Sequence, residues 1–136
     1  MTEAGAFEIR RPGVILAVAD VDRSVAFYRD SLKFEVEARF DAPAYAILTY
    51  GGFRLSLAEQ GHEAGDLLAV VPTAQADANR PAAMLVLEVA DCAAAREELS
   101  ARGVHFASEV FRPPWGGARC FARDHDGYLI ELEELA

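Results

Sequence analysis

The pattern of apolar and polar residues repeats along the chain. An apolar run ends in the tripeptide Val-Ala-Asp at 18–20, and a second apolar run ends in the same tripeptide at 89–91. Apolar residues then recur at helical spacing, strongly in the first copy and more weakly in the second; they are Val21, Val25, Tyr28 and Leu32, with Phe27 at the edge, and Ala94, Ala95 and Leu99. The pattern therefore predicts a strand followed by a helix, twice.

Helix boundaries are marked in both copies. Asp20 and Asp91 stand where a side-chain oxygen can accept hydrogen bonds from the free amides of a helix start. Gly103 stands where the second helix must end in a left-handed residue. These residues predict that the helices begin after Asp20 and Asp91.

Each copy also contains a predicted hairpin. Gly51-Gly52 and Asp126-Gly127 are tight-turn dipeptides, each followed by alternating apolar residues. Phe40 and Phe111 each end a further strand-like stretch. Each half therefore reads strand, helix, strand, strand, strand. We predict an α+β fold with two βαβββ modules that form an open, cupped mixed sheet, with the helices on its convex side.

The predicted domain organisation is one domain over residues 1–136. Module one spans about 8–58, a connector rich in Ala, Gly, Asp and Pro spans about 59–81, and module two spans about 82–136. Residues 67–71 of the connector are apolar enough for a short extra element. Alternation places Leu55 and Ile130 in the core under the helices, and Arg54, Ser56 and Glu131 on the opposite face. If the two sheets join edge to edge, that second face becomes a shared concave surface, which must hold a ligand or be plugged.

Composition narrows the classes of function. The chain has 136 residues, of which 52% are hydrophobic, and its net charge is −9. This charge has the wrong sign for binding a nucleic acid backbone, and the apolar runs are too short to span a bilayer. The N-terminus lacks an apolar signal-peptide core, and two cysteines give no disulfide framework. We therefore expect a cytoplasmic protein without nucleic acid or membrane partners, and the Ala- and Arg-rich composition indicates a bacterial source.

Three segments carry a family resemblance. Residues 18–34, 114–119 and 123–132 resemble the vicinal oxygen chelate superfamily, which includes glyoxalase I, extradiol dioxygenases, and fosfomycin- and bleomycin-resistance proteins. The resemblance covers nearly the whole chain outside the connector. It implies the fold predicted above, but the superfamily has very different functions, so it does not identify the activity.

The resemblance also implies where a metal ion would bind. Metal-using members carry ligands on the first and last strand of each module, and the corresponding residues here are Gly13, Ser56, Met84 and Glu131. Glycine offers no ligand, and a thioether or a neutral hydroxyl binds hard ions poorly. His62, His105, His125, Cys92 and Cys120 fall at none of these positions. We therefore predict no metal site of the family type and no cofactor.

Members without metal can act as binding proteins. Trp115 lies in a loop beside prolines and glycines, where its ring can stack on a planar or cationic ligand. The remaining candidate ligand-binding residues lie on predicted strands or at their ends; these residues are Glu131, Arg54, Phe40, Tyr45, Arg119, Phe121 and Met84. The sequence does not decide which face of the sheet Tyr45 and Phe121 occupy.

Glu131 has three alternative roles. It can form a structural ion pair, with Arg54, Arg39 or Arg119 as partner; it can bind an amine or hydroxyl of a ligand; or it can act as a general base. We favour a metal-independent small-molecule-binding homodimer, with antibiotic or toxin sequestration as one form of that function. The alternative is a lyase, isomerase or dioxygenase with an atypical divalent-metal site or with Glu131 as base, so the sequence leaves open whether the protein is an enzyme.

Overall fold

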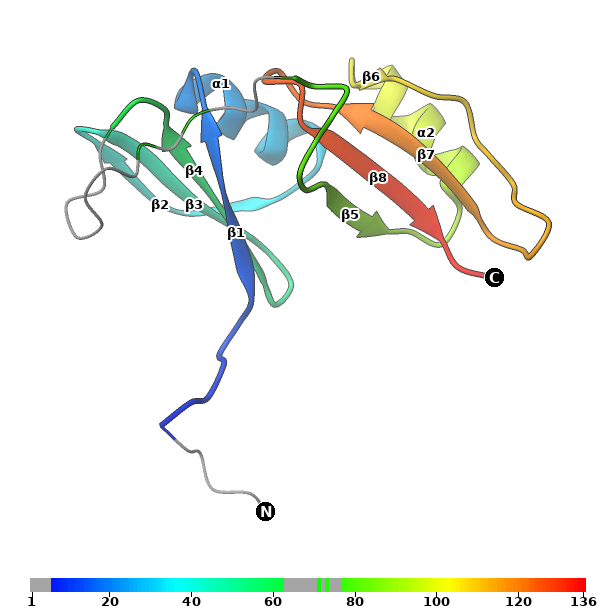
Figure 1. Ribbon diagram of the computed structural model, residues 1–136, viewed down its shortest axis with the longest axis horizontal. Helices are drawn as coiled ribbons and strands as arrows, with labels where there is room; N and C mark the ends of the chain where they lie inside the picture. Colours follow the sequence, from blue (N-terminus) through cyan, green and yellow to red (C-terminus); the bar gives the residue numbers. More distant parts are fainter. Residues whose placement is uncertain (1–5, 63–70, 72, 74–76) are drawn as a thin grey trace.

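The two predicted βαβββ modules are present in the computed structural model, which describes residues 6–62, 71, 73 and 77–136 (Figure 1). The elements of module one are β1 (Gly13–Val18), α1 (Val21–Ala26), the π-helical turn η1 (Phe27–Ser31), β2 (Glu35–Asp41), β3 (Ala44–Tyr50) and β4 (Phe53–Glu59). The elements of module two are β5 (Leu85–Glu88), α2 (Cys92–Ala101), β6 (His105–Phe106), β7 (Ala118–Arg123) and β8 (Leu129–Glu134). The α+β fold class is confirmed.

The strands form two sheets with the same topology. Module one has the order β1-β4-β3-β2, and module two has the order β5-β8-β7-β6. In each sheet the first strand pairs with the last in parallel and the other neighbours are antiparallel, so both sheets are mixed. Among the strands described, none pairs with a strand of the other module, so β1 and β5 each end a sheet.

The helices begin at the predicted residues. The Asp20 carboxylate accepts from the Arg23 amide, and the Asp91 carboxylate accepts from the Ala94 amide. Gly103 has φ 89° directly after α2, as its predicted role requires. The first helix differs from the expectation in one respect, because it widens into η1 from Phe27 onward.

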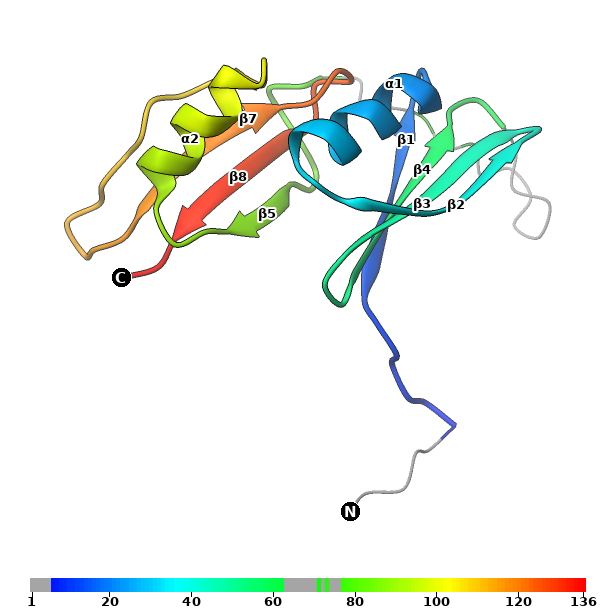
Figure 2. The ribbon, with the colours of Figure 1, turned by 180° about the vertical axis from the view of Figure 1, so that it is seen from behind.

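Both helices lie on the same side of the molecule, as a comparison of Figures 1 and 2 shows. Under them lies the apolar core, which includes the fully buried side chains of Leu48, Leu55, Leu57, Ile130 and Leu132. Alternation along the strands directs the intervening side chains to the opposite side. We call these two surfaces the helix-free faces of the sheets.

The turn between β7 and β8 joins the modules. Asp126 accepts hydrogen bonds from the Ala19 amide (2.8 Å) and the Ser24 hydroxyl (3.3 Å) of module one. The buried Tyr28 hydroxyl donates to Asp124 at 2.7 Å, and the Tyr128 hydroxyl donates to the Ala17 carbonyl at 2.7 Å. These bonds fix how module two sits against α1 and β1.

Two further expectations concern the connector and membranes. The short element predicted over 67–71 falls mostly on residues 67–70, which lie outside the described residues. Across the described parts of the chain, no helix combines the length and the apolar character that crossing a membrane requires.

Candidate functional site

The register of sheet one places three candidate residues on one helix-free face. Tyr45 pairs with Ala58, and Ile47 pairs with Ser56, so Tyr45, Ser56 and Arg54 project to the same side. The Phe40 ring lies on the same side, with its centroid 6.2 Å from that of Tyr45. The structure thereby settles the orientation of Tyr45, which the sequence left open.

Arg54 is held in place by two hydroxyl groups. Its Nε donates to Ser56 Oγ at 3.1 Å, and its Nη2 donates to Tyr45 Oη at 3.3 Å. Ser56 itself is almost completely buried, at 1% exposure. The guanidinium group is therefore fixed on the face rather than swinging freely in solvent.

Sheet two presents Glu131 on its own helix-free face. Glu131 pairs with Val86 on one side and Phe121 on the other, which puts Phe121 on the same face. The Glu131 side chain is 8% exposed, although no helix covers this face. Within the described part of the chain its carboxylate has no hydrogen bond or ion pair.

The three arginines that the sequence offered as partners of Glu131 lie elsewhere. Arg54 contacts Ser56 and Tyr45, and Arg39 pairs with Asp22. Arg119 lies over the Phe111 and Phe121 rings at 5.7 and 5.8 Å. The prediction of a structural ion pair between Glu131 and one of these arginines is therefore wrong for the single chain.

Trp115 and Met84 lie apart from these clusters. Trp115 is 79% exposed in the loop before β7, as its neighbouring prolines and glycines predict. Met84 precedes β5 and is half exposed, with its side chain beside a large cleft.

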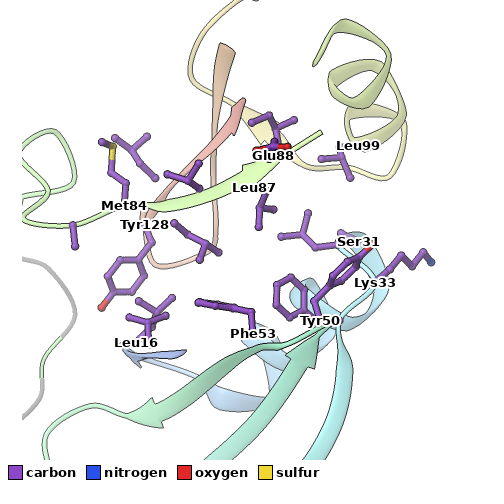
Figure 3. A pocket seen from close by; sticks show the side chains of 18 of the residues that line it. Leu16, Ser31, Lys33, Tyr50, Phe53, Met84, Leu87, Glu88, Leu99 and Tyr128 are labelled. Carbon is purple, nitrogen blue, oxygen red and sulfur yellow. The ribbon is translucent and has the colours of Figure 1, made fainter. Parts of the chain in front are cut away.

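This cleft lies between the edge strands β1 and β5 and has a volume of about 1170 Å³ (Figure 3). Its walls are mainly apolar, with Leu16 and Phe53 on the side of module one and Leu87 and Leu99 on the side of module two. Tyr128 lies at one end, and Ser31 and Lys33 lie toward the other. Of the candidate residues from the sequence, Met84 alone lines this cleft within the described chain.

Sequence reasoning missed the cleft for a physical reason. The alternation that places Leu55 and Ile130 in the core also predicts Phe53 and Tyr128 there, two residues earlier on the same predicted strands. The structure instead leaves both half buried, packed against the core and facing the cleft. The available signal was their position directly after each hairpin turn, at the end of a strand, where packing against a helix is incomplete.

The residues at the family's metal positions do not fit a metal ion. A Cβ at Gly13 would overlap the Arg54 carbonyl oxygen and lie 2.9 Å from Arg54 Cβ, so this position has no room for a ligand side chain. Ser56 already accepts from Arg54, and Met84 offers only a thioether. Among the described residues, no group of three His, Cys, Asp or Glu side chains could hold a metal ion.

The two cysteines form a buried pair between α2 and β7. Their sulfur atoms are 3.3 Å apart, and both residues are fully buried. Burial, together with the hydrogen bond to Cys92, raises the pKa of Cys120 to about 12. A thiol with this pKa is protonated at neutral pH and is therefore a poor nucleophile.

Comparison with known proteins identifies the family. The model of the Glyoxalase/Bleomycin resistance protein/Dioxygenase superfamily matches residues 11–132, and the chain therefore belongs to this superfamily. The comparison with curated proteins gives no match.

Solved structures with the same fold include one that is described as an antibiotic binding protein. TioX from Micromonospora sp. ML1 is 22% identical, with a TM-score of 0.74 over 93% of this chain and 98% of that one. SMU.1112c is 28% identical, with a TM-score of 0.70 over 96% and 100% of the two chains. TnmS3, an antibiotic binding protein from Streptomyces sp. CB03234, is 19% identical, with a TM-score of 0.68 over 98% and 100%.

Proposed function

We propose that this protein is a metal-independent small-molecule-binding protein that sequesters an antibiotic or toxin on its helix-free faces. The carrying observation is Glu131, a carboxylate at 8% exposure without a partner among the described residues. Leaving a buried charged group unpaired costs several kcal/mol. A ligand amine or hydroxyl that donates to Glu131 would remove this cost.

The surroundings of Glu131 support a ligand with an aromatic body. Phe121 lies beside Glu131 across the strands, and Phe111 lies beyond it, next to Arg119. Flat rings of this kind stack on planar ligands. Phe40 and Tyr45 supply a similar surface on the other sheet.

The proposal includes the formation of a homodimer. The cleft between β1 and β5 is apolar, and Ile15, Met84 and Val86 on these strands or beside them are 60%, 48% and 49% exposed. Two unpaired sheet edges beside such a surface favour association with a second copy. The site in the dimer would then combine helix-free faces from both chains. The cytoplasm remains the expected location.

The alternative of an enzyme rests on the same residue. A carboxylate buried against apolar side chains can serve as a general base, and the family includes dioxygenases by name. Turnover of a ligand that is lost in Glu131→Gln would favour this alternative, whereas binding without turnover favours sequestration.

The test uses Trp115, the single tryptophan of the chain. Its fluorescence is followed while planar aromatic antibiotics that carry a basic amine, such as doxorubicin, are titrated into the protein. We expect saturable binding that Glu131→Gln weakens about tenfold or more, the usual effect of losing a charge-assisted hydrogen bond.

Glu133→Gln is the matched control, because Glu133 lies two residues along the same strand on the same face. This variant should bind within about twofold of wild type. Manganese, nickel, zinc and ferrous ions should leave the melting temperature unchanged. Equal weakening in both variants, or no binding by any antibiotic of this class, contradicts the proposal.

A further inference from the structure

Arg54 differs from most arginines of this acidic protein. Many of the arginine guanidinium groups lie within 4.0 Å of a carboxylate; these are Arg11, Arg29, Arg39, Arg80, Arg96, Arg102 and Arg112. Arg54 has no such carboxylate in the described parts of the chain, and its two contacts are to neutral hydroxyl groups. Its charge is therefore oriented but not neutralised.

The orientation leaves donors available. A guanidinium group carries five N–H donors, of which Ser56 and Tyr45 occupy one each. The three that remain are both hydrogens on Nη1 and one hydrogen on Nη2. A guanidinium group binds the two oxygen atoms of a carboxylate through parallel N–H groups on two different nitrogen atoms, and Nη1 and Nη2 both keep a hydrogen for this purpose.

Arg54 lies beside two of the positions at which the family resemblance would place metal ligands. Arg54 donates to Ser56, and its backbone closes the space at Gly13, so it obstructs two of the four positions that the family resemblance assigns to metal ligands. A divalent ion at that place would attract two neighbouring oxygens of a ligand. A fixed guanidinium group attracts the same pair of oxygens without a metal.

We propose that Arg54 binds the carboxylate, or the carboxylate and adjacent ionised phenol oxygen, of an aromatic acid. The neighbouring Tyr45 and Phe40 rings, 6.2 Å apart, would pack against the aromatic body. This inference rests on the proposed function and adds the class of ligand.

The test compares salicylate with salicylamide, which has the same shape but no charge. Trp115 fluorescence and the melting temperature report binding at millimolar concentrations. Wild type should bind salicylate about tenfold or more tightly than salicylamide. Added salt should lower the affinity for salicylate and leave the affinity for salicylamide unchanged. Arg54→Met should remove the preference, whereas Arg54→Lys should keep a reduced one, because lysine retains the charge but not the fork.

Arg23→Met is the matched control. Arg23 lies exposed on α1, and the described residues place no carboxylate within 4.0 Å of it. This variant should keep the full preference for salicylate. Because Arg54→Lys retains the charge and most of the side-chain volume, it keeps the test decisive even if Arg54→Met is poorly folded.

The outcomes separate this inference from the proposed function. If the amine-bearing antibiotics bind but salicylate does not, Arg54 is not an acid site and the sequestration proposal stands. If neither class binds, both fail. If Arg54→Met keeps the preference for salicylate but weakens self-association, Arg54 pairs with a carboxylate of a second copy, and the inference is overturned.

Discussion

Gly13 is the residue of β1 that pairs with Arg54 of β4. A side chain at this residue would overlap the Arg54 backbone, whereas a Cβ at Gly52, in the hairpin turn, meets no atom within 4 Å. Both glycines have φ outside the left-handed region, so steric space alone distinguishes them. The close approach also positions Arg54, because the two residues are direct partners in the parallel ladder.

Gly13→Ala should therefore lower the free energy of unfolding by about 1–3 kcal/mol, the usual cost of forcing atoms into a closely packed site. Gly52→Ala should change it by less than about 0.5 kcal/mol. The urea midpoint of each variant measures both effects. An equal midpoint for Gly13→Ala and wild type would show that β1 can move away from β4 at little cost.

Single residues were predicted well wherever local chemistry decides their role. Asp20 and Asp91 are N-caps, and Gly103 ends α2, because these roles depend on a few neighbouring backbone groups. The partners of Arg54 could not be predicted in this way. Tyr45 lies on β3 and Arg54 on the neighbouring strand β4, and only the register of the hairpin brings them together.

At the scale of elements, the turn between β7 and β8 acts as the connection between modules. Burial raises the pKa of Asp124 in this turn above its ordinary value, while hydrogen bonds from Tyr28 and from the amides of Asp126 and Tyr128 partly oppose the shift. The folded state therefore holds this proton to a higher pH than the unfolded chain does. Stability linked to Asp124 is greatest in acid and is lost as the pH rises through the raised pKa.

Asp124→Asn removes this titration. The stability of wild type relative to Asp124→Asn should therefore be greater near pH 4 than at pH 7, as measured by urea unfolding at both values. Tyr28→Phe should enlarge the pH dependence, because it removes a hydrogen bond that lowers the pKa of Asp124. A difference between wild type and Asp124→Asn that grows toward pH 7 would contradict the assigned direction.

The elements themselves followed the sequence closely, with one instructive exception. Val21, Val25 and Tyr28 are buried as their helical spacing predicts. The periodicity did not reveal η1, in which Phe27 and Tyr28 are both buried although they are adjacent. A π-helical turn widens the ring of backbone bonds and changes the angular spacing of side chains, which a pattern based on regular α-helix spacing does not represent.

At the scale of the whole molecule, the two sheets remain separate. The sequence fits either an edge-to-edge union of the sheets or two independent sheets, since pairing at an edge uses backbone groups that every residue carries. The structure shows β1 and β5 unpaired with each other, with the apolar cleft between them. The proposed homodimer would cover this cleft.

Ile15→Glu tests the dimer directly. Ile15 is 60% exposed on β1, so the folded chain should tolerate the change, but a charge there should weaken association through the cleft. Sedimentation should show dimers of wild type and monomers of Ile15→Glu at micromolar concentration. Leu135→Glu is the control, with 61% exposure outside the cleft lining. A monomeric wild type would contradict the proposed dimer.

The separate sheets have a consequence for how sequestration would depend on the amount of protein. If each binding site is shared between two chains, ligand capture and dimer formation are linked by mass action. Dilute protein would then hold little ligand, and the captured amount would rise more steeply than the protein concentration. A cell would gain protection only above a threshold of expression, and the ligand, by favouring the paired form, would itself lower that threshold.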